Sequence, residues 1–373
     1  MRLGFDGKRV IQNFTGLGNY SRYILNVLTK YYPENSYLIY TAKMPDHDQR
    51  SKARNIDFRH PPEKKFAGLW RTFSIIKDLK RDKIGLYHGL SNEIPAGLGR
   101  AGIPSVVTIH DLIFLRYPQY YKFIDRTIYR LKFNYACHNA DYVIAISEQT
   151  KKDIIHYFQI PEEKIKVIYQ NCSSSFHEKL SKEAKEKIRS AYSLPGRYLL
   201  NVGTIEPRKN LMLIAKALKS VSDDIHLVVV GKVTPYTVQV KNQLESAGLS
   251  HRVHFLTGVK SSDLPGIYQL ADIFIYPSKF EGFGIPIVEA LHSGVPVIAA
   301  TGSCLEEAGG KSSYYVDPQD DEQLGNYINL ILNNPDIAAK MIEQGYDYVK
   351  KFDDKSIAAD LMAVYQQAVN DYA

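Results

Sequence analysis

The sequence predicts an α/β protein made of two domains, each built on a doubly wound parallel sheet. Short apolar runs typical of buried strands alternate with amphipathic helical segments along almost the whole chain, as in parallel sheets covered by helices on both faces. The alternation occurs twice, on either side of a polar stretch at residues 172–196. A length of 373 residues is also long for a single hydrophobic core, which favours two domains.

The first domain is predicted over residues 1–171. A loop that contains Gly16 and Gly18 follows its first strand and opens an amphipathic helix. Strands are expected at residues 2–7, 37–42, 85–90, 105–112, 142–147 and 164–170, with further helices at 64–83, 118–139 and from 148 onward.

The second domain is predicted over residues 197–354, after a linker at 172–196 that contains Ser173-Ser174-Ser175 and continues as an alternating Lys/Glu helix. Its strands are expected at residues 198–204, 225–231, 253–258, 273–278, 296–300 and 313–318. Helices separate these strands and continue to the end of the chain.

Composition limits the class of protein. Three cysteines at positions without metal-ligand spacing indicate buried thiols in a reducing compartment. The first residues carry charges where a secretory signal needs an apolar core, and no apolar run approaches the roughly 20 residues of a membrane span. We therefore expect a cytoplasmic protein.

Charge is distributed unevenly between the two halves. Residues 1–190 hold 32 Lys and Arg against 19 Asp and Glu, whereas the remaining residues hold 15 against 21. The basic segment 64–83 also has apolar residues at helical spacing, including Leu69, Trp70 and Phe73. Two interpretations stay open: a core-facing helix with a basic outer face, or a helix that lies on an anionic membrane surface and holds the protein at its inner face. No nucleic-acid partner is expected.

The stretch EGFGIPIVEALHSGVPVIAA, residues 281–300, is the motif around which the second domain is organised. It places Glu281 and Glu289 between two predicted parallel strands, where the first strand ends and a short helix begins. In open parallel sheets, ligands bind beyond the carboxyl ends of the strands. The amides of Phe283 and Gly284 are expected at the positive end of this helix, where an anion can bind.

A pair of cations follows another buried strand of the same domain. GTIEPRKN, residues 203–210, places Arg208 and Lys209 at the start of a helix. Two cations beside a helix N-terminus can bind a dianion, because Arg offers a planar fork of donors and Lys a compact charge. Cations for a diphosphate and carboxylates for ribose and sugar hydroxyls together suit a nucleotide-sugar; a solvated surface pair is the alternative.

Three features of the first half resemble catalytic, dinucleotide-binding or metal-binding sites. His110 ends a predicted strand, so it is a candidate catalytic group rather than a core histidine. The loop with Gly16 and Gly18 lacks the third glycine of a dinucleotide fingerprint, which argues against a dehydrogenase. Asp46-His47-Asp48 resembles a metal-binding triplet, but it lies in a polar loop, and we expect no metal site.

These motifs together resemble the retaining glycosyltransferases of the GT-B fold. The resemblance covers nearly the full length and rests on GLGNYSRYIL, TIHDL, DYVIAISEQTKKDI, VGTIEPRKN, the long motif from TGVKSSDL to GVPVI, and LEEAGGKSSYYVDPQD. It implies two Rossmann-like domains facing a central crevice, and a last helix at residues 355–373 that returns to the first domain. Two departures are Gln170-Asn171-Cys172 in place of the family's Asn-Gly turn, and Phe352-Asp353-Asp354 near the last helix, where a Trp is usual.

The resemblance also implies roles for individual residues. Glu289 is expected to bind the ribose of the donor and Glu281 its sugar, while Arg208 and Lys209 hold the diphosphate and His110 lies near sugar and acceptor. The expected catalytic residues are therefore His110, Arg208, Lys209 and Glu281, and the donor-binding residues are Gly16, Gly18, Gly203, Gly258, Val259, Phe283, Gly284, Ile285 and Glu289. Neither a metal nor a cofactor is expected, since the leaving phosphate helps to deprotonate the acceptor in this family.

The sequences of these motifs are most similar to those of transferases that use GDP-mannose to build cell-surface polysaccharides. We therefore expect mannosyl transfer to a glycan or lipid-linked acceptor. A UDP-sugar donor with glucosyl or N-acetylhexosaminyl transfer is the main alternative. A nucleotide-sugar 2-epimerase of the same fold is less favoured, because no motif in the first domain indicates the additional acid/base carboxylates that it requires.

Overall fold

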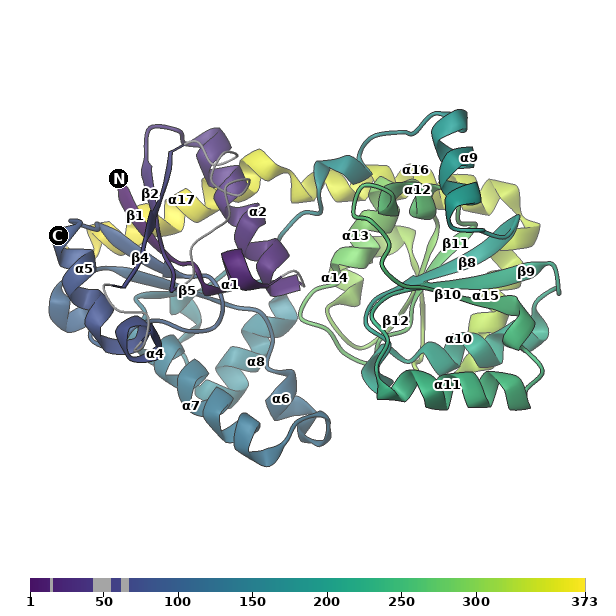
Figure 1. The fold of residues 1–373 in the computed structure, drawn as a ribbon, viewed down its shortest axis with the longest axis horizontal. Helices are drawn as coiled ribbons and strands as arrows, with labels where there is room; N and C mark the ends of the chain where they lie inside the picture. Colours follow the sequence, from purple (N-terminus) through teal and green to yellow (C-terminus); the bar gives the residue numbers. More distant parts are fainter. Residues whose placement is uncertain (14–15, 43–54, 62–66, 373) are drawn as a thin grey trace. The chain divides into compact units, whose positions relative to one another are not determined.

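The computed structural model describes residues 1–13, 16–42, 55–61 and 67–372. The chain divides into two compact units, one formed by Met1–Gln170 together with Phe352–Ala373 and the other by Asn171–Lys351. Each unit consists of a parallel sheet with helices on both faces (Figure 1). The predicted α/β class with two doubly wound sheets is therefore confirmed.

The first unit contains a seven-stranded sheet in the order β3-β2-β1-β4-β5-β6-β7, and all its neighbouring strands are parallel. The strand order reverses between β1 and β4, which makes this pair the topological switch point of the sheet. The strands are β1 (Arg2–Asp6), β2 (Ser36–Tyr40), β3 (Ile56–Arg59), β4 (Leu86–Gly89), β5 (Ser105–Ile109), β6 (Tyr142–Ala145) and β7 (Ile165–Val167).

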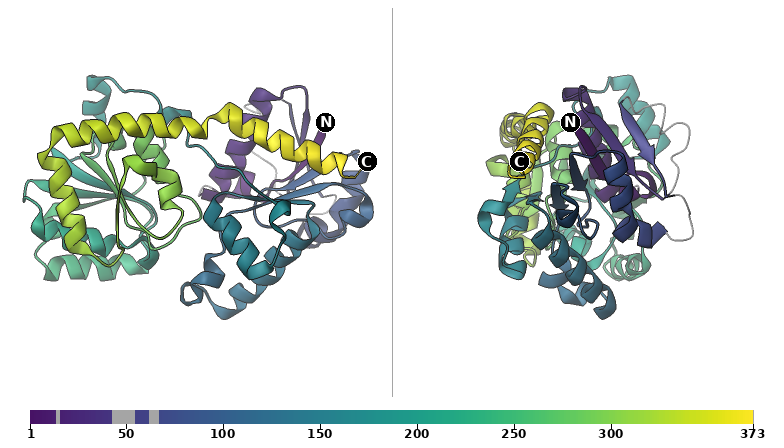
Figure 2. Two further views of the ribbon diagram at one scale, coloured as in Figure 1. Left: turned by 180° about the vertical axis from the view of Figure 1, so that it is seen from behind. Right: turned by 90° about the vertical axis from the view of Figure 1, so that its left-hand side faces the viewer.

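Helices cover both faces of this sheet, and the last helix of the chain is one of them. Figure 2 shows α17, in yellow, lying across the first unit. It is held there by hydrogen bonds from Tyr23 to Asp354 (2.9 Å) and between His88 Nδ1 and the Tyr365 hydroxyl (2.6 Å). The α-helices described in this unit are α1 (Lys8–Gln12), α2 (Gly16–Tyr31), α4 (Ala67–Leu69), α5 (Ile75–Arg81), α6 (Ile113–Arg116), α7 (Phe123–Asn139), α8 (Glu148–Phe158) and α17 (Asp354–Asn370).

The second unit contains a six-stranded sheet in the order β10-β9-β8-β11-β12-β13, again with parallel neighbours only. Its switch point lies between β8 and β11. The strands are β8 (Arg197–Val202), β9 (Ile225–Val230), β10 (Val253–Leu256), β11 (Ile273–Tyr276), β12 (Val297–Ala300) and β13 (Tyr314–Val316). The helices are α9 (Lys182–Ala191), α10 (Leu211–Ala217), α11 (Pro235–Ser246), α12 (Leu264–Gln269), α13 (Ile285–His292), α14 (Leu305–Gly309), α15 (Asp321–Asn333) and α16 (Pro335–Val349).

The segment predicted as a linker, residues 172–196, belongs to the second unit. Its helix α9 packs on α12, where Ile188 lies so close to Gly266 that a Cβ there would be 2.3 Å from the isoleucine. The Tyr192 hydroxyl also donates to Asp263 (2.8 Å). A polar, charged composition hid this packing, because no residue of α9 is fully buried and Ile188 itself is only half-buried.

Several features of the first unit differ from the prediction. Gly16 and Gly18 lie in helix α2 rather than in the expected loop, and the short helix α1 follows β1. Strand β3 was not predicted, because it is short and its sequence, IDFR, carries two charges. The basic segment 64–83 is described from residue 67 and is not one regular helix: a π-helix, η2 (Trp70–Ser74), separates α4 from α5. The wider turn puts Trp70 in the core (5% exposed), where its indole N–H donates to Asp78 (2.7 Å), and leaves Leu69 and Phe73 each 59% exposed.

Within the described residues, none of the helices has both the length and the apolar character that crossing a membrane requires.

Candidate functional site

The switch point of the second unit brings Arg208, Lys209 and Glu281 together. The two cations lie on a short 3₁₀ turn, η7 (Pro207–Lys209), that follows β8, and Glu281 lies in the loop after β11. One carboxylate oxygen of Glu281, Oε1, is 2.7 Å from Arg208 Nη1 and 2.7 Å from Lys209 Nζ. The three side chains are only 12% to 15% exposed. The sheet topology therefore joins two sequence motifs into one site.

Further contacts fix the two cations. Lys209 also donates to the Tyr276 hydroxyl (2.6 Å) at the end of β11. Arg208 donates to the carbonyl of Phe280 and to Glu206 Oε1 (2.7 Å). Lys209 is held by the end of β11 and the loop after it, and Arg208 by that loop and by Glu206, so the cations are oriented before any ligand binds.

Charge explains the ionisation state of this cluster. Burial alone raises the pKa of Glu281, but the nearby charges of Lys209 and Arg208, and their hydrogen bonds, outweigh it and lower the pKa to about 2. Burial acts against both cations, yet the Glu281 carboxylate raises the pKa values of Arg208 and Lys209. All three groups are therefore charged at pH 7.

Glu289, which lies on α13, has a different environment from Glu281. Its Oε2 accepts a hydrogen bond from the Tyr268 hydroxyl (2.8 Å) on α12. The residue is half-buried, and burial raises the pKa of its carboxyl group to about 7, although the tyrosine bond acts in the opposite direction. Glu281 and Glu289 therefore differ by several pKa units, as carboxylates with different tasks often do.

The start of α13 is built by tight packing. Gly284 has φ +130, and a Cβ there would lie 3.1 Å from Leu305 and 3.2 Å from Ala308. The Cys304 thiol donates to the carbonyl oxygens of Glu281 and Phe283, both at 3.0 Å. Ile285 is the first residue of α13. These contacts press the loop after β11 against α14 and so position both Glu281 and the helix start.

The remaining predicted donor residues of this unit lie along the same edge of the sheet. Gly203 follows β8 with φ +152, and its Cα faces the side chain of Lys209, whose Cε would be 3.6 Å from an added Cβ. Gly258 and Val259 follow β10, which is separated from β8 by β9. Gly203 is thus part of the cation cluster, whereas Gly258 and Val259 lie farther along the edge.

His110 lies directly after β5 in the first unit and is 6% exposed. Its Nε2 is 2.9 Å from the Leu90 carbonyl, so this nitrogen carries a proton, and the ring of Tyr20 packs edge-on at 4.5 Å. Burial lowers the pKa of His110 to about 4, against the effect of the Leu90 bond. The imidazole is therefore neutral and held in one orientation.

Gly16 begins α2, and Gly18 has a local packing role. A Cβ at Gly18 would be 1.7 Å from the carbonyl oxygen of Asn13, whose side chain accepts the Gly18 amide (3.2 Å). Glycine is therefore required here for the turn itself. The Asp46-His47-Asp48 triplet lies outside the described residues.

An ion cluster at the switch point of the first unit was not predicted. Asp6 ends β1, Glu93 follows β4, and Arg71 from the π-helix bonds to both. Its guanidinium donates twice to Asp6 (3.0 and 2.8 Å) and once to Glu93 (2.8 Å), which also pairs with Lys132 (3.2 Å). A small pocket is lined by these groups. Asp6 at the end of the first strand was the only available sequence signal.

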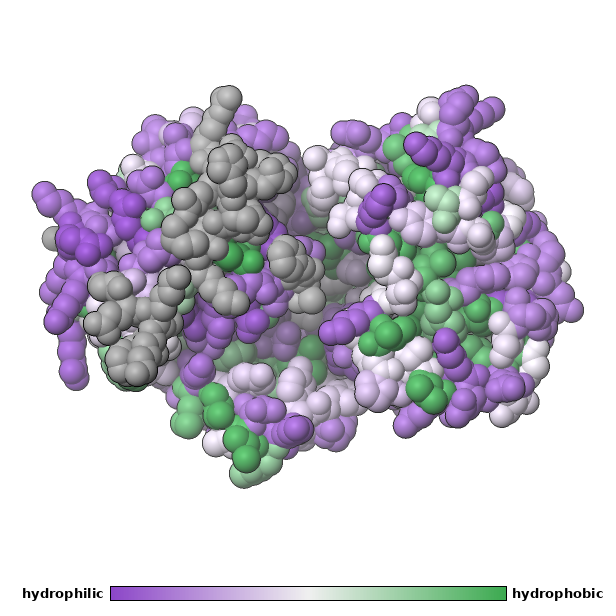
Figure 3. Space-filling view, viewed as in Figure 1, coloured by the Kyte–Doolittle hydropathy of each residue, from purple (hydrophilic) through white to green (hydrophobic). Residues whose placement is uncertain are grey.

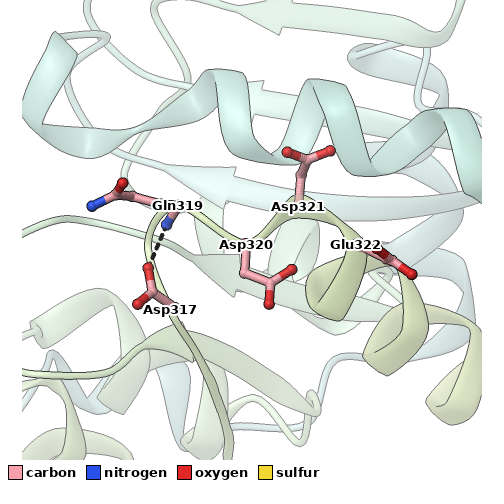
Figure 4. Close-up of a pocket in the computed structure, with 5 residues that line it drawn as sticks. All are labelled: Asp317, Gln319, Asp320, Asp321 and Glu322. Carbon is pink, nitrogen blue, oxygen red and sulfur yellow. Dashed lines mark hydrogen bonds between the residues drawn. The ribbon is translucent and has the colours of Figure 1, made fainter.

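A surface hollow in the second unit is lined by Asp317, Gln319, Asp320, Asp321 and Glu322 (Figure 4). Asp317 accepts the backbone N–H of Gln319 (2.8 Å), and Asp320 accepts that of Gln323 (2.8 Å) as the cap of α15. Capping and the positive end of a helix account for this acidic group.

Comparison with protein families gives one match for each unit. Residues 19–170 match the model of "Glycosyltransferase Family 4", and residues 184–348 match "Glycosyl transferases group 1". The O-antigen chain mannosyltransferase B of Escherichia coli is 27% identical over 75% of this chain and 74% of that protein. The O-antigen chain mannosyltransferase RfbU of Salmonella typhimurium is 29% identical over 66% of this chain and 65% of its own length.

Similar solved structures cover almost the whole chain. The Anabaena protein HepE in complex with UDP and glucose superimposes with a TM-score of 0.78 at 19% identity, over 98% of this chain and 99% of HepE. WaaG, a glycosyltransferase of lipopolysaccharide biosynthesis, gives a TM-score of 0.72 at 17% identity, over 98% of this chain and 99% of WaaG. These likenesses show the fold. Because the two family matches together account for most of both units, the chain belongs to the glycosyltransferases of the GT-B fold, with a family 4 domain followed by a group 1 domain.

Proposed function

We propose that this glycosyltransferase moves a mannosyl group from GDP-mannose to a glycan or lipid-linked acceptor of a cell-surface polysaccharide, with retention of anomeric configuration. Support for the sugar comes from the relatives named as O-antigen mannosyltransferases. A UDP-sugar donor is the second candidate, because HepE is described in complex with UDP and glucose. A nucleotide-sugar 2-epimerase is a third and weaker candidate. It requires additional acid/base carboxylates in the first domain, and the carboxylates of Asp6 and Glu93 there are both paired with Arg71.

The observation that carries the proposal is the Arg208–Lys209–Glu281 cluster. When the glycosidic bond of the donor breaks, negative charge grows on the leaving diphosphate. Two oriented, buried cations stabilise that charge most strongly in the transition state, because they need not reorganise. One fixed donor of this kind contributes about 3 to 4 kcal/mol in comparable enzymes.

The two carboxylates take different hydroxyl groups of the donor in this proposal. Glu281 stays ionised and lies beside both cations, so it accepts hydroxyls of the sugar that is joined to the diphosphate. Glu289 has two acceptor oxygens and suits the neighbouring hydroxyls of a ribose. Tyr268 fixes one of these oxygens and thereby the orientation of the carboxylate.

The first unit supplies the acceptor side in this proposal. His110 is a neutral imidazole held by the Leu90 carbonyl, which suits a group that orients a sugar hydroxyl. No metal or cofactor takes part in the proposed step, and the phosphate oxygen that leaves accepts the proton of the attacking hydroxyl.

The experiment is a transfer assay with GDP-mannose, UDP-glucose and UDP-N-acetylglucosamine, each with lipid-linked oligosaccharide acceptors. We expect mannosyl transfer with GDP-mannose at a rate well above that with either UDP-sugar. NMR of the product is expected to show the anomeric configuration of the donor. An inverted product contradicts the retaining mechanism, a preference for a UDP-sugar contradicts the donor, and epimerised free donor contradicts transfer itself.

Helix α7 offers a surface for an acceptor embedded in a membrane. Ile124, Ile128, Leu131 and Tyr135 form a stripe at helical spacing, and their exposed fractions lie between 36% and 71%. The apolar residues of this region are visible at the lower edge of the first unit in Figure 3. Lys132 lies beside the stripe, and Lys122, Arg126 and Arg130 add positive charge on other faces of the helix. An exposed apolar stripe on a basic helix suits an anionic lipid surface better than the segment 64–83, whose Trp70 is buried.

Vesicle binding tests this part of the proposal. The variant Ile124→Ser with Leu131→Ser is expected to bind vesicles that contain phosphatidylglycerol at least about 10-fold more weakly than wild type, because two apolar anchors are lost. The matched control, Leu69→Ser with Phe73→Ser, changes two equally exposed residues of the segment 64–83 and is expected to bind normally. If only the control variant loses vesicle binding, the membrane contact belongs to the segment 64–83. If the wild-type protein does not bind these vesicles at low salt, the proposed membrane contact is wrong.

A further inference from the structure

Three side chains with metal-binding atoms converge in the second unit, away from the cation cluster. Cys172 and His177 lie on either side of the 3₁₀ turn η6 (Ser174–Phe176), and His292 is the last residue of α13. Their ligand atoms all lie within 4.8 Å of one another, and Cys172 Sγ is 3.8 Å from His177 Nε2. The rings of His177 and His292 stack with centroids 3.8 Å apart. Because His292 is more than 100 residues away in sequence, no spacing motif indicates this group.

We propose that Cys172, His177 and His292 form a binding site for Zn²⁺ or a similar divalent transition metal. A thiolate and two imidazoles are the ligands that zinc prefers, and they exclude Mg²⁺ and Ca²⁺, which take oxygen ligands. Tetrahedral zinc with bonds of about 2.3 Å to sulfur and about 2.0 Å to nitrogen separates its ligand atoms by roughly 3.3 to 3.5 Å. In the structure, Cys172 Sγ and His177 Nε2 are 3.8 Å apart and all three ligand atoms lie within 4.8 Å of one another. Three protein ligands leave the fourth position for water or an oxygen ligand.

Burial and exposure within the cluster suit reversible metal binding. Cys172 is buried, His292 is half-buried and His177 is exposed, so one side of the site faces solvent. His292 Nε2 is 3.2 Å from Asn171 Oδ1, a contact that orients the ring as a supporting residue does at metal sites.

Metal binding requires one rearrangement. Stacked imidazoles direct their nitrogen lone pairs along nearly parallel lines, which do not meet at one ion. The exposed ring of His177 must therefore turn away from the stack, whereas His292 and Cys172 keep their places. Turning one exposed side chain costs little compared with forming a zinc–ligand bond.

The site adjoins the predicted donor carboxylate. Phe176, between two of the ligands, packs edge-on against Tyr268 with ring centroids 5.5 Å apart, and Tyr268 donates to Glu289. His292 lies on the same helix as Glu289. A bound metal therefore fixes the segment 172–177 against Tyr268, which holds Glu289. The expected effect on donor affinity rests on the proposed function, whereas metal binding itself does not.

The test uses the full chain without a polyhistidine tag, in a phosphine reductant that does not bind metals. Co²⁺ replaces Zn²⁺ as a spectroscopic probe: one equivalent is expected to give visible bands of tetrahedral cobalt and a sulfur-to-cobalt charge-transfer band, both removed by Zn²⁺. Cys172→Ser is expected to lose the charge-transfer band, and His177→Gln and His292→Gln to weaken Co²⁺ binding at least about 10-fold. His177 is exposed, so its replacement does not threaten folding.

A second histidine pair provides the control. His226 and His254 lie on neighbouring strands with ring nitrogens 3.0 Å apart and belong to the same unit. His254→Gln is expected to leave the cobalt spectrum unchanged. Absence of the charge-transfer band in wild type, or its persistence in Cys172→Ser, overturns the metal site. A normal cobalt spectrum without any change of donor affinity overturns only the coupling, and loss of transferase activity against every donor leaves the metal result intact.

Discussion

At the scale of single residues, Glu289 gives the clearest pH dependence. Burial raises its pKa to about 7, so the carboxylate is protonated below that pH and ionised above it. A protonated carboxyl cannot accept both hydroxyls of a ribose. Affinity for the intact donor is therefore expected to fall about tenfold from pH 8 to pH 6, following the ionised fraction of one group. Calorimetric titration with GDP-mannose measures this, since its diphosphate has no terminal phosphate that titrates in the same range.

Two variants separate Glu289 from other sources of pH dependence. Glu289→Gln is expected to bind more weakly at pH 8 and to show a flat profile. Tyr268→Phe removes the hydrogen bond that lowers the pKa of Glu289, so the midpoint of the profile is expected to move to higher pH. A midpoint that stays in place in Tyr268→Phe, or a slope that persists in Glu289→Gln, assigns the titration to another group.

Sequence reasoning identified Arg208, Lys209, Glu281 and Glu289 because strand ends can be recognised from short apolar runs. It did not show that one oxygen of Glu281 contacts both cations, because that contact joins residues more than 70 positions apart. Arg71 was missed because its partner Asp6 lies 65 positions away and its partner Glu93 lies in a loop without a pattern. Distant partners follow from strand order, which a single sequence does not state.

At the scale of elements, the loop that leads into α13 depends on Gly284. An alanine there meets two costs: φ +130 is unfavourable for any residue with a side chain, and the added Cβ lies 3.1 Å from Leu305. Gly284→Ala is expected to lower the free energy of unfolding by about 1 to 3 kcal/mol and to weaken donor binding, because α13 carries Glu289. Urea unfolding measures the first effect and calorimetry the second.

Gly248→Ala is the matched control, because Gly248 also has positive φ (+68) but has nothing within 4 Å of an added Cβ. This substitution is expected to cost about 1 kcal/mol and to leave donor binding unchanged. Equal losses of stability and binding in both variants contradict a specific role for the packing around Gly284.

Regular elements could be predicted where the pattern of apolar residues and the residues that end an element indicate the same boundaries. The strands on both sides of residues 281–295 are examples. The π-helix at Trp70–Ser74 could not be predicted, because the apolar spacing there fits an ordinary helix. The wider turn shows only in the backbone, where the Ile75 N–H donates to the Trp70 carbonyl. Strand β3 is too short and too charged to be recognised from a pattern of apolar residues.

At the scale of the whole molecule, both units use the same sheet order up to their sixth strand. Each switch point gathers charged side chains: Asp6, Arg71 and Glu93 in the first unit, and Arg208, Lys209 and Glu281 in the second. The class of fold was predictable because alternating strands and helices leave few other arrangements. The start of the second unit was less predictable, because the polar segment 172–196 looks like a linker but packs as part of a domain.

The most direct test of the proposed function is the kinetic effect of Arg208→Ala. Loss of this cation is expected to lower kcat/KM for GDP-mannose by about 100-fold to 1,000-fold, because it acts on the leaving diphosphate. Arg197→Ala removes an exposed arginine at the opposite end of the same strand region and is expected to change kcat/KM less than twofold. If Arg208→Ala folds normally and retains wild-type kcat/KM, the cation cluster is not the site of donor cleavage.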